Sequence, residues 1–586
     1  MRDRSHAAER IVTGWIFIKR RRDVLFQVME VLIPCIFLAF SSVFHQCFYT
    51  PKLLSIYALA LSCVLALTLR EEIILPSKKI SIFLASYAAL IVMSGLIAPA
   101  PRYGLIQILF LFSAITLYIA MLNLTDDQRQ LVLDSVYYTA AAESTLIIFQ
   151  FMIRGRAILP GPLLQEPARL SGTIGNPEFA ATLLGVSFII GLNKLQRQRK
   201  NTHKAAVFAS LFLMAAGILL TRSKGTFIFL GAYLIWRYHR NPKTLMAAAI
   251  FGLALIAKFF PVSILGRLFL WIIALKMFRS HFWKGVGLTQ FENNYLSTVH
   301  NLFANNPALL IPFGGFTSLT LDAHNIILQN AAELGIAGLI LSAIFVRYAT
   351  KLVISRNNPL TAALAMLLCK SLYTVVLNSP TSMLLLAVVF GSLSSGEKSL
   401  RWKPRSWKSV VPLTAVATAA FLLGSIFCLS DYWYQKGLVN EFIGNTGTAA
   451  NYFKKSIQIN SENSNSCLGL AYANFLEGNR TKMSFYIHRA IHYRRDMDTY
   501  KISAHMYYYS GLYPQAAILY QYILSVFPQH LTSMAKLALI FQATHRNRAA
   551  IAMARRILAT RSRRKNASDF GNIETARRIL REYGAI

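Results

Sequence analysis

Long apolar runs alternate with short polar stretches over most of the chain. A run of roughly 17 to 25 apolar residues is enough for a helix to cross the hydrocarbon core of a bilayer. Thirteen such runs predict transmembrane helices, centred near residues 24–43, 52–69, 80–98, 102–121, 131–152, 178–192, 205–220, 225–236, 244–260, 326–346, 359–377, 381–394 and 410–429. The eighth and twelfth runs are short, so these two helices are expected to tilt or break.

The pattern changes after Leu429, where a Tyr-rich, helix-forming sequence replaces the apolar runs. Gly478 and Gly511 stand 33 positions apart, each after a similar apolar segment, and a third such segment, residues 537–544, follows at the same interval. Pro528 closes one of these units. A period near 34 residues with glycine between paired helices is typical of tetratricopeptide repeats. Three to four degenerate repeats are expected to stack into a short solenoid.

Composition supports a membrane protein, because 55% of the residues are hydrophobic, only 15% are charged and the mean hydropathy is +0.43. The net charge of +36 does not indicate nucleic-acid binding, since most of the Lys and Arg residues form short clusters between apolar runs. Placing the basic N-terminus in the cytoplasm puts the clusters around Lys194, Arg237, Arg347 and Lys403 on the same side, as the positive-inside rule requires. The first span is interpreted as uncleaved.

The sequence therefore predicts an all-α fold with about twelve or thirteen transmembrane helices and a helical repeat domain at the C-terminus. The expected parts are a basic cytoplasmic N-terminus (1–23), transmembrane helices (24–260 and 324–429), a long outer loop (261–323) and the repeats (430–586). With thirteen spans, the repeats lie on the outer side, opposite the N-terminus.

Metal and redox chemistry receive no support from the sequence. The cysteines fall mainly within apolar segments, without CxxC or histidine-paired spacing, and we interpret them as packing residues. The outer carboxylates Glu166, Glu178, Glu292 and Asp322 are scattered, without a DxD motif. We expect no metal and no cofactor.

The outer loop contains an apolar piece of its own, Ile264 to Phe278. It is short for a span and contains Arg267 and Lys276, which would be costly in lipid. Trp271 follows Arg267 by one helical turn. The piece predicts a helix lying in the membrane interface, with its cations facing phosphates and its aromatic side chains in lipid.

Candidate chemistry begins with His324, which stands where the outer loop re-enters the membrane. With an unperturbed pKa of about 6.5, histidine can take a proton from an attacking hydroxyl near neutral pH. Arginine suits the oxygens of a lipid diphosphate, which leaves readily once its charge is neutralised. The outer cations that oppose the positive-inside bias are Arg154, Arg156, Arg169, Arg222, Lys224, Arg267, Lys276, Arg279 and Lys284.

Four blocks resemble those of the O-antigen ligase and polymerase superfamily of bacterial membrane glycosyltransferases. Arg169-Leu-Ser-Gly-Thr-Ile-Gly-Asn-Pro177 is similar to an R-x-S-G-T-x-x-N-P turn, and Leu220-Thr-Arg-Ser-Lys-Gly225 to a T-x-S-R-G turn. Arg267 to Trp271, followed by Gly285-Val-Gly287, resembles R-x-x-x-W…G-x-G. The segment from His324 and Asn325 to Gly338 resembles the H-N-x9-G-x-x-G motif of the ligases, the most specific of the four.

The resemblance covers roughly residues 20–430. It implies a GT-C-like enzyme of the bacterial inner membrane that moves a glycan from undecaprenyl diphosphate to an acceptor, such as lipid A–core, on the periplasmic side without a metal. His324 would activate the acceptor hydroxyl, while Arg267 and the cations Arg222 and Lys224 would hold the diphosphate. Lys224 departs from the family's arginine. Arg169 and Asn325 are further candidates for substrate binding.

Other interpretations remain open at several positions. His324 would alternatively cap a helix, Asp322 would orient His324 or only end the loop, and Glu333 would bond a neighbouring helix. Gly335 and Gly338 would allow close helix packing.

Two alternative activities and one non-enzymatic class also remain. The alternatives are a polysaccharide polymerase, a protein O-oligosaccharyltransferase whose repeats bind a protein partner, and, with less support, a transporter of lipid-linked sugars.

Overall fold

The computed structural model describes residues 23–98, 101–153, 170–238, 264–314, 322–356, 358–374, 376–395, 397, 399–403, 407–560 and 567–585. Within these ranges the fold is all-α apart from two short strands, as the sequence predicts. The chain forms two compact units. The first contains Met1–Val92, Leu105–Lys258 and Leu341–Cys428, and the second contains Met93–Gly104, Phe259–Ile340 and Leu429–Ile586.

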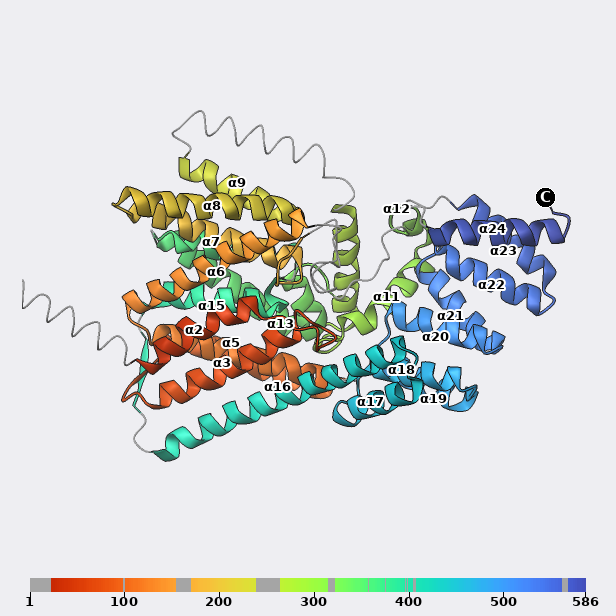
Figure 1. The fold of residues 1–586 in the computed structure, drawn as a ribbon, viewed down its shortest axis with the longest axis horizontal. Helices are drawn as coiled ribbons and strands as arrows, with labels where there is room; N and C mark the ends of the chain where they lie inside the picture. The colour runs from red at the N-terminus through yellow and green to blue at the C-terminus, as the bar shows by residue number, and fades with distance from the viewer. Residues whose placement is uncertain are drawn as a thin grey trace, which may run out of the picture. The chain divides into compact units, whose positions relative to one another are not determined.

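The first unit is a bundle of apolar helices that pack side by side around one buried core (Figure 1). Its helices are α2 (Val24–Leu38), α3 (Thr50–Thr68), α4 (Lys78–Ile97), α5 (Pro101–Leu122), α6 (Asp126–Met152), α7 (Pro177–Arg197), α8 (Asn201–Thr221), α9 (Lys224–Tyr238), α14 (Leu360–Ser371), η3 (Val376–Asn378) and α15 (Pro380–Ser394). Helices α4, α5, α13 (Ile326–Ser355) and α16 (Trp407–Phe442) contribute residues to both units.

Twelve of the thirteen predicted spans coincide with helices, and the ninth, 244–260, lies outside the described residues. Eight helices among the described residues are long and apolar enough to cross a membrane: α3 to α8, α13 and the part of α16 from Val411 to Phe442. Helices α2, α9, α14 and α15 are apolar but shorter. The eighth and twelfth runs form two of these short helices, α9 and α15.

A two-stranded antiparallel sheet joins distant segments of the first unit. Strand β1 (Ile73–Leu75) pairs with β2 (Leu400–Trp402), so that Ile73 lies opposite Trp402. Strand β1 follows α3 and β2 precedes α16, in two loops that the charge pattern predicts to be cytoplasmic. The pairing agrees with that topology, because both strands must lie on the same side of the membrane.

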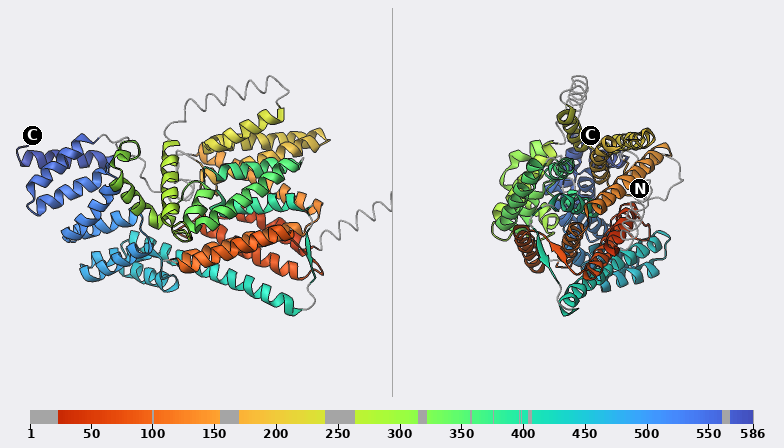
Figure 2. Two further views of the ribbon diagram at one scale, coloured as in Figure 1. Left: turned by 180° about the vertical axis from the view of Figure 1, so that it is seen from behind. Right: turned by 90° about the vertical axis from the view of Figure 1, so that its left-hand side faces the viewer.

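The second unit contains a solenoid of paired antiparallel helices (Figure 1, cyan to blue; Figure 2, left). The end of α16 packs on α17 (Thr446–Ile459) through the Tyr434–Phe453 ring contact. The pairs that follow are α18 (Ser464–Leu476) with α19 (Arg480–Tyr493), α20 (Met497–Tyr509) with α21 (Tyr513–Val526), and α22 (Leu531–Ala543) with α23 (Asn547–Ala559), and α24 (Ala567–Glu582) packs on the last pair.

A residue with positive φ stands between the two helices of each pair: Gly444, Gly478, Gly511 and His545, at intervals of 34, 33 and 34 residues. The turns with positive φ therefore recur at the repeat period that the sequence predicts.

The same unit includes the described part of the outer loop. Residues 264–280 form a helix, and α11 (Phe291–Asn305) follows, with η2 (Pro307–Leu309) and α12 (Leu310–Phe313) after it. Buried side chains of the loop and of the solenoid belong to one hydrophobic cluster. The loop and the repeats therefore have to lie on one side of the membrane.

Candidate active site

His324 lies directly before α13 with its side chain 38% exposed, so that it can be reached from solvent. Its Nδ1 atom is 2.9 Å from Oδ1 of Asp322, and the same oxygen accepts a hydrogen bond of 2.8 Å from the His324 backbone N–H. Asp322 thus contacts both the main chain and the ring of His324. The φ angle of His324 is 50°, a left-handed conformation that is uncommon outside glycine and concentrates at functional sites.

The residues after His324 hold the helix start in place. The side-chain oxygen of Asn325 accepts hydrogen bonds from the backbone N–H groups of Ile327 (3.0 Å) and Leu328 (3.1 Å), which makes Asn325 the N-cap of α13. Gln329 reaches back from the first turn, and its Oε1 accepts a 2.7 Å hydrogen bond from the N–H of Ala323. The loop is therefore fixed on both sides of His324.

Helix α13 is broken at Gly335, where φ is 67° and ψ is −154°. The carbonyls released by this break accept hydrogen bonds from the Gly285–Gly287 segment: Val286 N–H donates to Ala332 (2.8 Å) and Gly287 N–H to Glu333 (3.0 Å). In return, the N–H of Ile336 donates to the carbonyl of Phe282 at 2.8 Å. Two of the blocks found in the sequence thus bond directly to each other through their backbones.

This geometry changes the interpretation of the glycines. A Cβ on Gly335 would lie 2.5 Å from the carbonyl oxygen of Trp283, and one on Gly285 would lie 2.3 Å from the backbone of Glu333. The expectation of close helix–helix packing at Gly335 and Gly338 was wrong. Gly335 is needed for its positive φ and for the approach of a loop, and a Cβ on Gly338 would meet Asn330, from the preceding turns of the same helix.

Glu333 is a buried carboxylate that connects this break to α11. Its Oε1 accepts hydrogen bonds from the N–H of Phe291, the first residue of α11 (3.2 Å), and from Nε2 of Gln329 (2.9 Å). A carboxylate at a helix N-terminus also interacts favourably with the helix dipole. Glu333 therefore bonds a neighbouring helix, as one interpretation of the sequence proposed.

The helix 264–280 carries Arg267, whose side chain is half-buried. Phe269 on this helix is fully buried, and its ring stacks at 5.8 Å from Phe303 and at 5.3 Å from Phe313. The expectation that the aromatic side chains of this helix lie in lipid is therefore wrong for Phe269. The indole Nε1 of Trp271 is buried and has no hydrogen-bond acceptor among the described residues. Buried N–H groups in folded proteins are usually hydrogen-bonded, so this indole N–H is an exception.

In the first unit, the Leu220–Gly225 turn joins α8 to α9. Arg222 ends α8 with φ of 54°, and the side chains of Arg222 and Lys224 are both exposed. Ser223 between them is buried, and its hydroxyl donates a 2.6 Å hydrogen bond to the carboxylate of Glu178. The turn thus anchors its serine inward and presents its two cations outward.

A buried lysine lies beneath this turn. The Lys370 ammonium group is fully buried and donates to the carbonyl of Glu178 (3.0 Å) and to Oγ1 of Thr226 (2.8 Å). It also lies 3.5 Å from the Glu178 carboxylate and 3.4 Å from the Ser223 hydroxyl. This network fixes the turn that carries Arg222 and Lys224.

The Arg169–Pro177 block forms a tight turn held from several helices. The Thr173 N–H donates to the buried carboxylate of Glu143 at 3.1 Å, and the carbonyl of Thr173 accepts a 2.6 Å hydrogen bond from the Lys52 ammonium. Asn176 caps the start of α7. Arg169 itself lies outside the described residues.

Lys370, Lys52 and Glu143 are buried charged residues that no sequence motif identified. Lys370 and Lys52 are each the only charged residue of an apolar helix, and Glu143 is the only charged residue in the apolar second half of α6. Such isolated charges are the signal that could have identified them. Lys370 bonds to Ser223 of the Leu220–Gly225 turn, and Lys52 and Glu143 bond to Thr173 of the Arg169–Pro177 turn.

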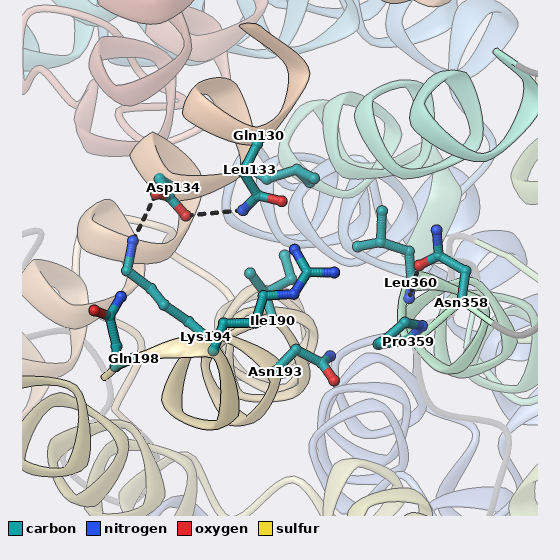
Figure 3. A pocket seen from close by; sticks show the side chains of 11 residues that line it. Gln130, Leu133, Asp134, Ile190, Asn193, Lys194, Gln198, Asn358, Pro359 and Leu360 are labelled. Atoms are coloured by element: carbon teal, nitrogen blue, oxygen red, sulfur yellow. Dashed lines mark hydrogen bonds and ion pairs between the residues drawn. The ribbon is translucent and has the colours of Figure 1, made fainter. Parts of the chain in front are cut away.

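A cavity of ≈ 210 Å³ lies elsewhere in the first unit, and most of the residues that line it are polar (Figure 3). In it, Asp134 forms an ion pair of 2.6 Å with Lys194 and accepts a hydrogen bond of 3.1 Å from Gln130. Lys194 is at the end of α7 and Glu178 is at its start. The cavity is therefore at the opposite end of α7 from the Ser223 turn, on the side predicted to be cytoplasmic.

The described residues contain no group of three or more His, Cys, Asp or Glu side chains that could hold a metal ion. What they offer is one imidazole with a carboxylate partner in the second unit, and exposed cations on a fixed turn in the first. Such groups suit proton transfer from a hydroxyl and charge neutralisation at phosphate oxygens.

Comparison with known proteins gives one informative match. Residues 209–343 match the family described as O-antigen ligase. No curated protein matches the chain. Among solved structures, the chain is similar to one titled "Crystal structure of APC/C hetero-tetramer Cut9-Hcn1", with 13% sequence identity, a TM-score of 0.24 and coverage of 83% of each chain.

The family match includes the Leu220–Gly225 turn, Arg267, the Gly285–Gly287 segment and His324, and it ends within α13. It therefore contains three of the four blocks recognised in the sequence, and the Arg169–Pro177 block precedes it. The resemblance of this membrane protein to the O-antigen ligase family is thereby confirmed over residues 209–343.

Proposed function

We propose that this protein is a metal-independent glycosyltransferase of the O-antigen ligase type. It moves a glycan from undecaprenyl diphosphate to a hydroxyl group of lipid A–core on the periplasmic face of the bacterial inner membrane. The observation that carries the proposal is the His324–Asp322 pair before α13, within the segment that matches the family.

The roles of the residues follow from their chemistry. Nδ1 of His324 lies 2.9 Å from the Asp322 carboxylate, without the angles of a hydrogen bond. We propose that the charge of this carboxylate keeps the ring proton on Nδ1 and leaves Nε2 as the base. Nε2 accepts the proton of the acceptor hydroxyl as its oxygen attacks the anomeric carbon. The bond from that carbon to the diphosphate oxygen breaks, and the diphosphate leaves with the electron pair. This single displacement inverts the anomeric centre.

Arg267, Arg222 and Lys224 are proposed to neutralise the diphosphate oxygens, with Arg169 as a further cation. Arginine can bind two phosphate oxygens at once, whereas Lys224 acts as a point charge. Asn325 caps α13 through its side-chain oxygen, so in this proposal it fixes the helix start beside His324 in addition to its proposed contact with substrate.

The test is His324→Ala in the native host, with lipopolysaccharide and the carrier-lipid pool analysed together. Loss of a ligase leaves bare core and long glycans on the carrier lipid. His281→Ala is the matched control, because His281 is an exposed histidine of the same loop region without an assigned role. Full glycan transfer in His324→Ala would contradict the proposed base.

A second candidate is a protein O-oligosaccharyltransferase. The observation that favours it is that buried side chains of the repeats and of the outer loop belong to one hydrophobic cluster. In this proposal, a protein bound by the repeats is on the same side of the membrane as His324. In that case the His324→Ala strain has normal lipopolysaccharide and lacks glycoprotein bands. A polymerase gives a third result, in which the core carries a single repeat unit.

A further inference from the structure

The outer loop and the solenoid share one hydrophobic core. Helix α11 buries a stripe of side chains at helical spacing, including Phe291, Tyr295, Val299 and Phe303. These side chains belong to the same cluster as buried residues of the repeats, such as Tyr520. Helix α11 also packs against α21, in the third helix pair. The repeats therefore hold a helix of this chain.

A polar contact fixes the N-terminal end of α11 to the repeats. Arg494, in the connection between α19 and α20, donates through Nη2 to Oε1 of Glu292 at 3.1 Å and through Nε to the same oxygen at 3.3 Å. Its Nη1 reaches Oδ1 of Asn465 at 3.3 Å, and its Nη2 lies 2.8 Å from Oδ2 of Asp496. Arg494 thus joins one carboxylate of the loop to polar groups of two repeats.

Asn293, the next residue of α11, reinforces this contact. Its Nδ2 donates to the carbonyl of Tyr493 at 3.2 Å, and its Oδ1 accepts from the N–H of Arg495 at 3.1 Å. Farther along α11, Nδ1 of His300 lies 2.8 Å from the Ser525 hydroxyl. The helix is therefore held along its length and not only at its first turn.

A continuous series of contacts leads from this end of α11 to His324. Glu292 follows Phe291, whose N–H donates to Glu333. Glu333 accepts from Gln329, and Gln329 accepts from the N–H of Ala323, the residue before His324. Each contact in this series has a hydrogen-bond length between 2.7 and 3.2 Å.

We propose that the C-terminal repeats are a built-in support for the His324 loop, and that Arg494 is a positioning residue that acts through Glu292 and α11. The proposal rests on the function proposed above for His324. It gives the solenoid a role within the enzyme, whether or not it also binds a partner.

The experiment uses the full-length protein in lipid nanodiscs and measures transfer kinetics together with amide hydrogen exchange at residues 323–329. Arg494→Ala is expected to lower kcat about tenfold, because a displacement of the order of 1 Å can cost up to about a hundredfold. The KM for the lipid-linked donor stays within about twofold, since Arg494 does not contact substrate. The amide of Ala323 exchanges about tenfold faster, because its acceptor Gln329 is held less firmly.

Three further variants separate positioning from general stability. Arg489→Ala is the matched control, because its Nη2 donates to the carbonyl of Ser461 within the repeats at 3.1 Å, without touching the loop; it keeps wild-type kcat and exchange. Arg494→Lys recovers part of the lost kcat. In the double variant Glu292→Ala/Arg494→Ala, kcat is no lower than in Arg494→Ala alone, because both residues act in one series.

Each outcome decides between the two proposals. Wild-type kcat and exchange in Arg494→Ala, or an equal loss in Arg489→Ala, would overturn the positioning role while leaving His324 as the base. If His324→Ala retains full transfer, the proposed base is wrong. The exchange at residues 323–329 then still tests whether Arg494 supports the loop.

Discussion

Gly478 in the solenoid and Gly335 in α13 have similar φ angles, 72° and 67°, but their surroundings differ. A Cβ on Gly478 would meet no atom within 4 Å, whereas one on Gly335 would lie 2.5 Å from the Trp283 carbonyl oxygen. The equivalent turn of the last repeat contains His545, with φ of 57°. In the solenoid turns, glycine is favoured only because φ is positive. In α13, glycine is needed for the positive φ and also because the backbone of another segment comes too close for a side chain.

The difference teaches where side chains can be exchanged. Repeats obtain their stability from a pattern that recurs, so that a single turn tolerates a strained residue. The helix break has no second copy, and the backbone of Gly285–Gly287 occupies it. Disturbing it would displace Glu333 and the His324 loop together.

The largest effect is expected for Gly335→Ala, because neither Trp283 nor Phe282 can yield space: the contacting atoms are backbone carbonyls. Glycan transfer should fall by at least about a hundredfold, given the sensitivity of catalysis to a displacement of the order of 1 Å. Transfer per folded protein is the measurement, and Gly478→Ala is the control of the same φ. Transfer near the wild-type level in Gly335→Ala would show that the close approach is not required.

A loss of stability is expected for Lys370→Met, which removes the buried cation beneath the Ser223 turn. Removing one partner of a buried ion pair typically costs about 3 kcal/mol or more, because the other charge loses its compensation. Thermal unfolding in detergent measures the change, and Lys351→Met, which alters an exposed lysine, is the control. Equal melting temperatures for the two variants would contradict the role of Lys370.

Acid should destabilise the solenoid at the start of α22. Nδ1 of His530 accepts a 3.2 Å hydrogen bond from the Ser533 N–H and so caps α22 in its neutral form. Burial, together with the nearby Lys501 and His505, lowers the pKa of His530 from 6.5 to about 4. The folded state thus binds the proton less tightly than the unfolded state, and stability is lost as the pH falls from 6.5 towards 4.

The loss at pH 4 is at most about 3 kcal/mol from this group. Amide exchange at the start of α22 in the full-length protein, measured from pH 7 to pH 4, is the readout. His530→Asn keeps a capping oxygen that does not titrate, and it should show a weaker pH dependence. An unchanged pH dependence in His530→Asn would assign the effect to another group, such as His505, whose pKa is also lowered by burial.

The smallest effects are expected at the solenoid turns. Gly478→Ala should cost about 1 kcal/mol, since only the left-handed conformation opposes the side chain. His545→Gly tests the reverse and should change stability by no more than about 1 kcal/mol, in the favourable direction. Thermal unfolding of the two variants gives both values. If glycan transfer falls as much in Gly478→Ala as in Gly335→Ala, the contrast between the two regions is wrong.

These contrasts also explain what could be predicted from the sequence. The spans and the repeats were predictable because hydrophobic runs and a 34-residue period directly reflect burial. The pairing of Gly285–Gly287 with the carbonyls at residues 332 and 333 was not, because backbone hydrogen bonds leave no residue pattern. The role of Arg494 was also not predictable, because its partner Glu292 lies 202 positions away in the chain and no pattern links the two residues.

The candidate site was predictable only in part. His324, Arg267 and the Arg222–Lys224 turn were found through motifs, and all of them fall in the matched segment. Asn325 is predicted to bind substrate, which stays a prediction, and its role as a helix cap was not visible in the motif. Glu143 and Lys370 went unnoticed, since a single charge in an apolar run does not reveal which turn it supports.

The small sheet between β1 and β2 has a consequence for biogenesis. Ile73 emerges early during synthesis, whereas its partner Trp402 is made only after most of the transmembrane helices. Strand β1 therefore has no partner strand until the segments between residues 75 and 400 have been synthesised. Once β2 arrives, the ladder ties the first hairpin of the bundle to the helix that leads into the repeats. Pairing of β1 with β2 is thus a late step in the assembly of the membrane part.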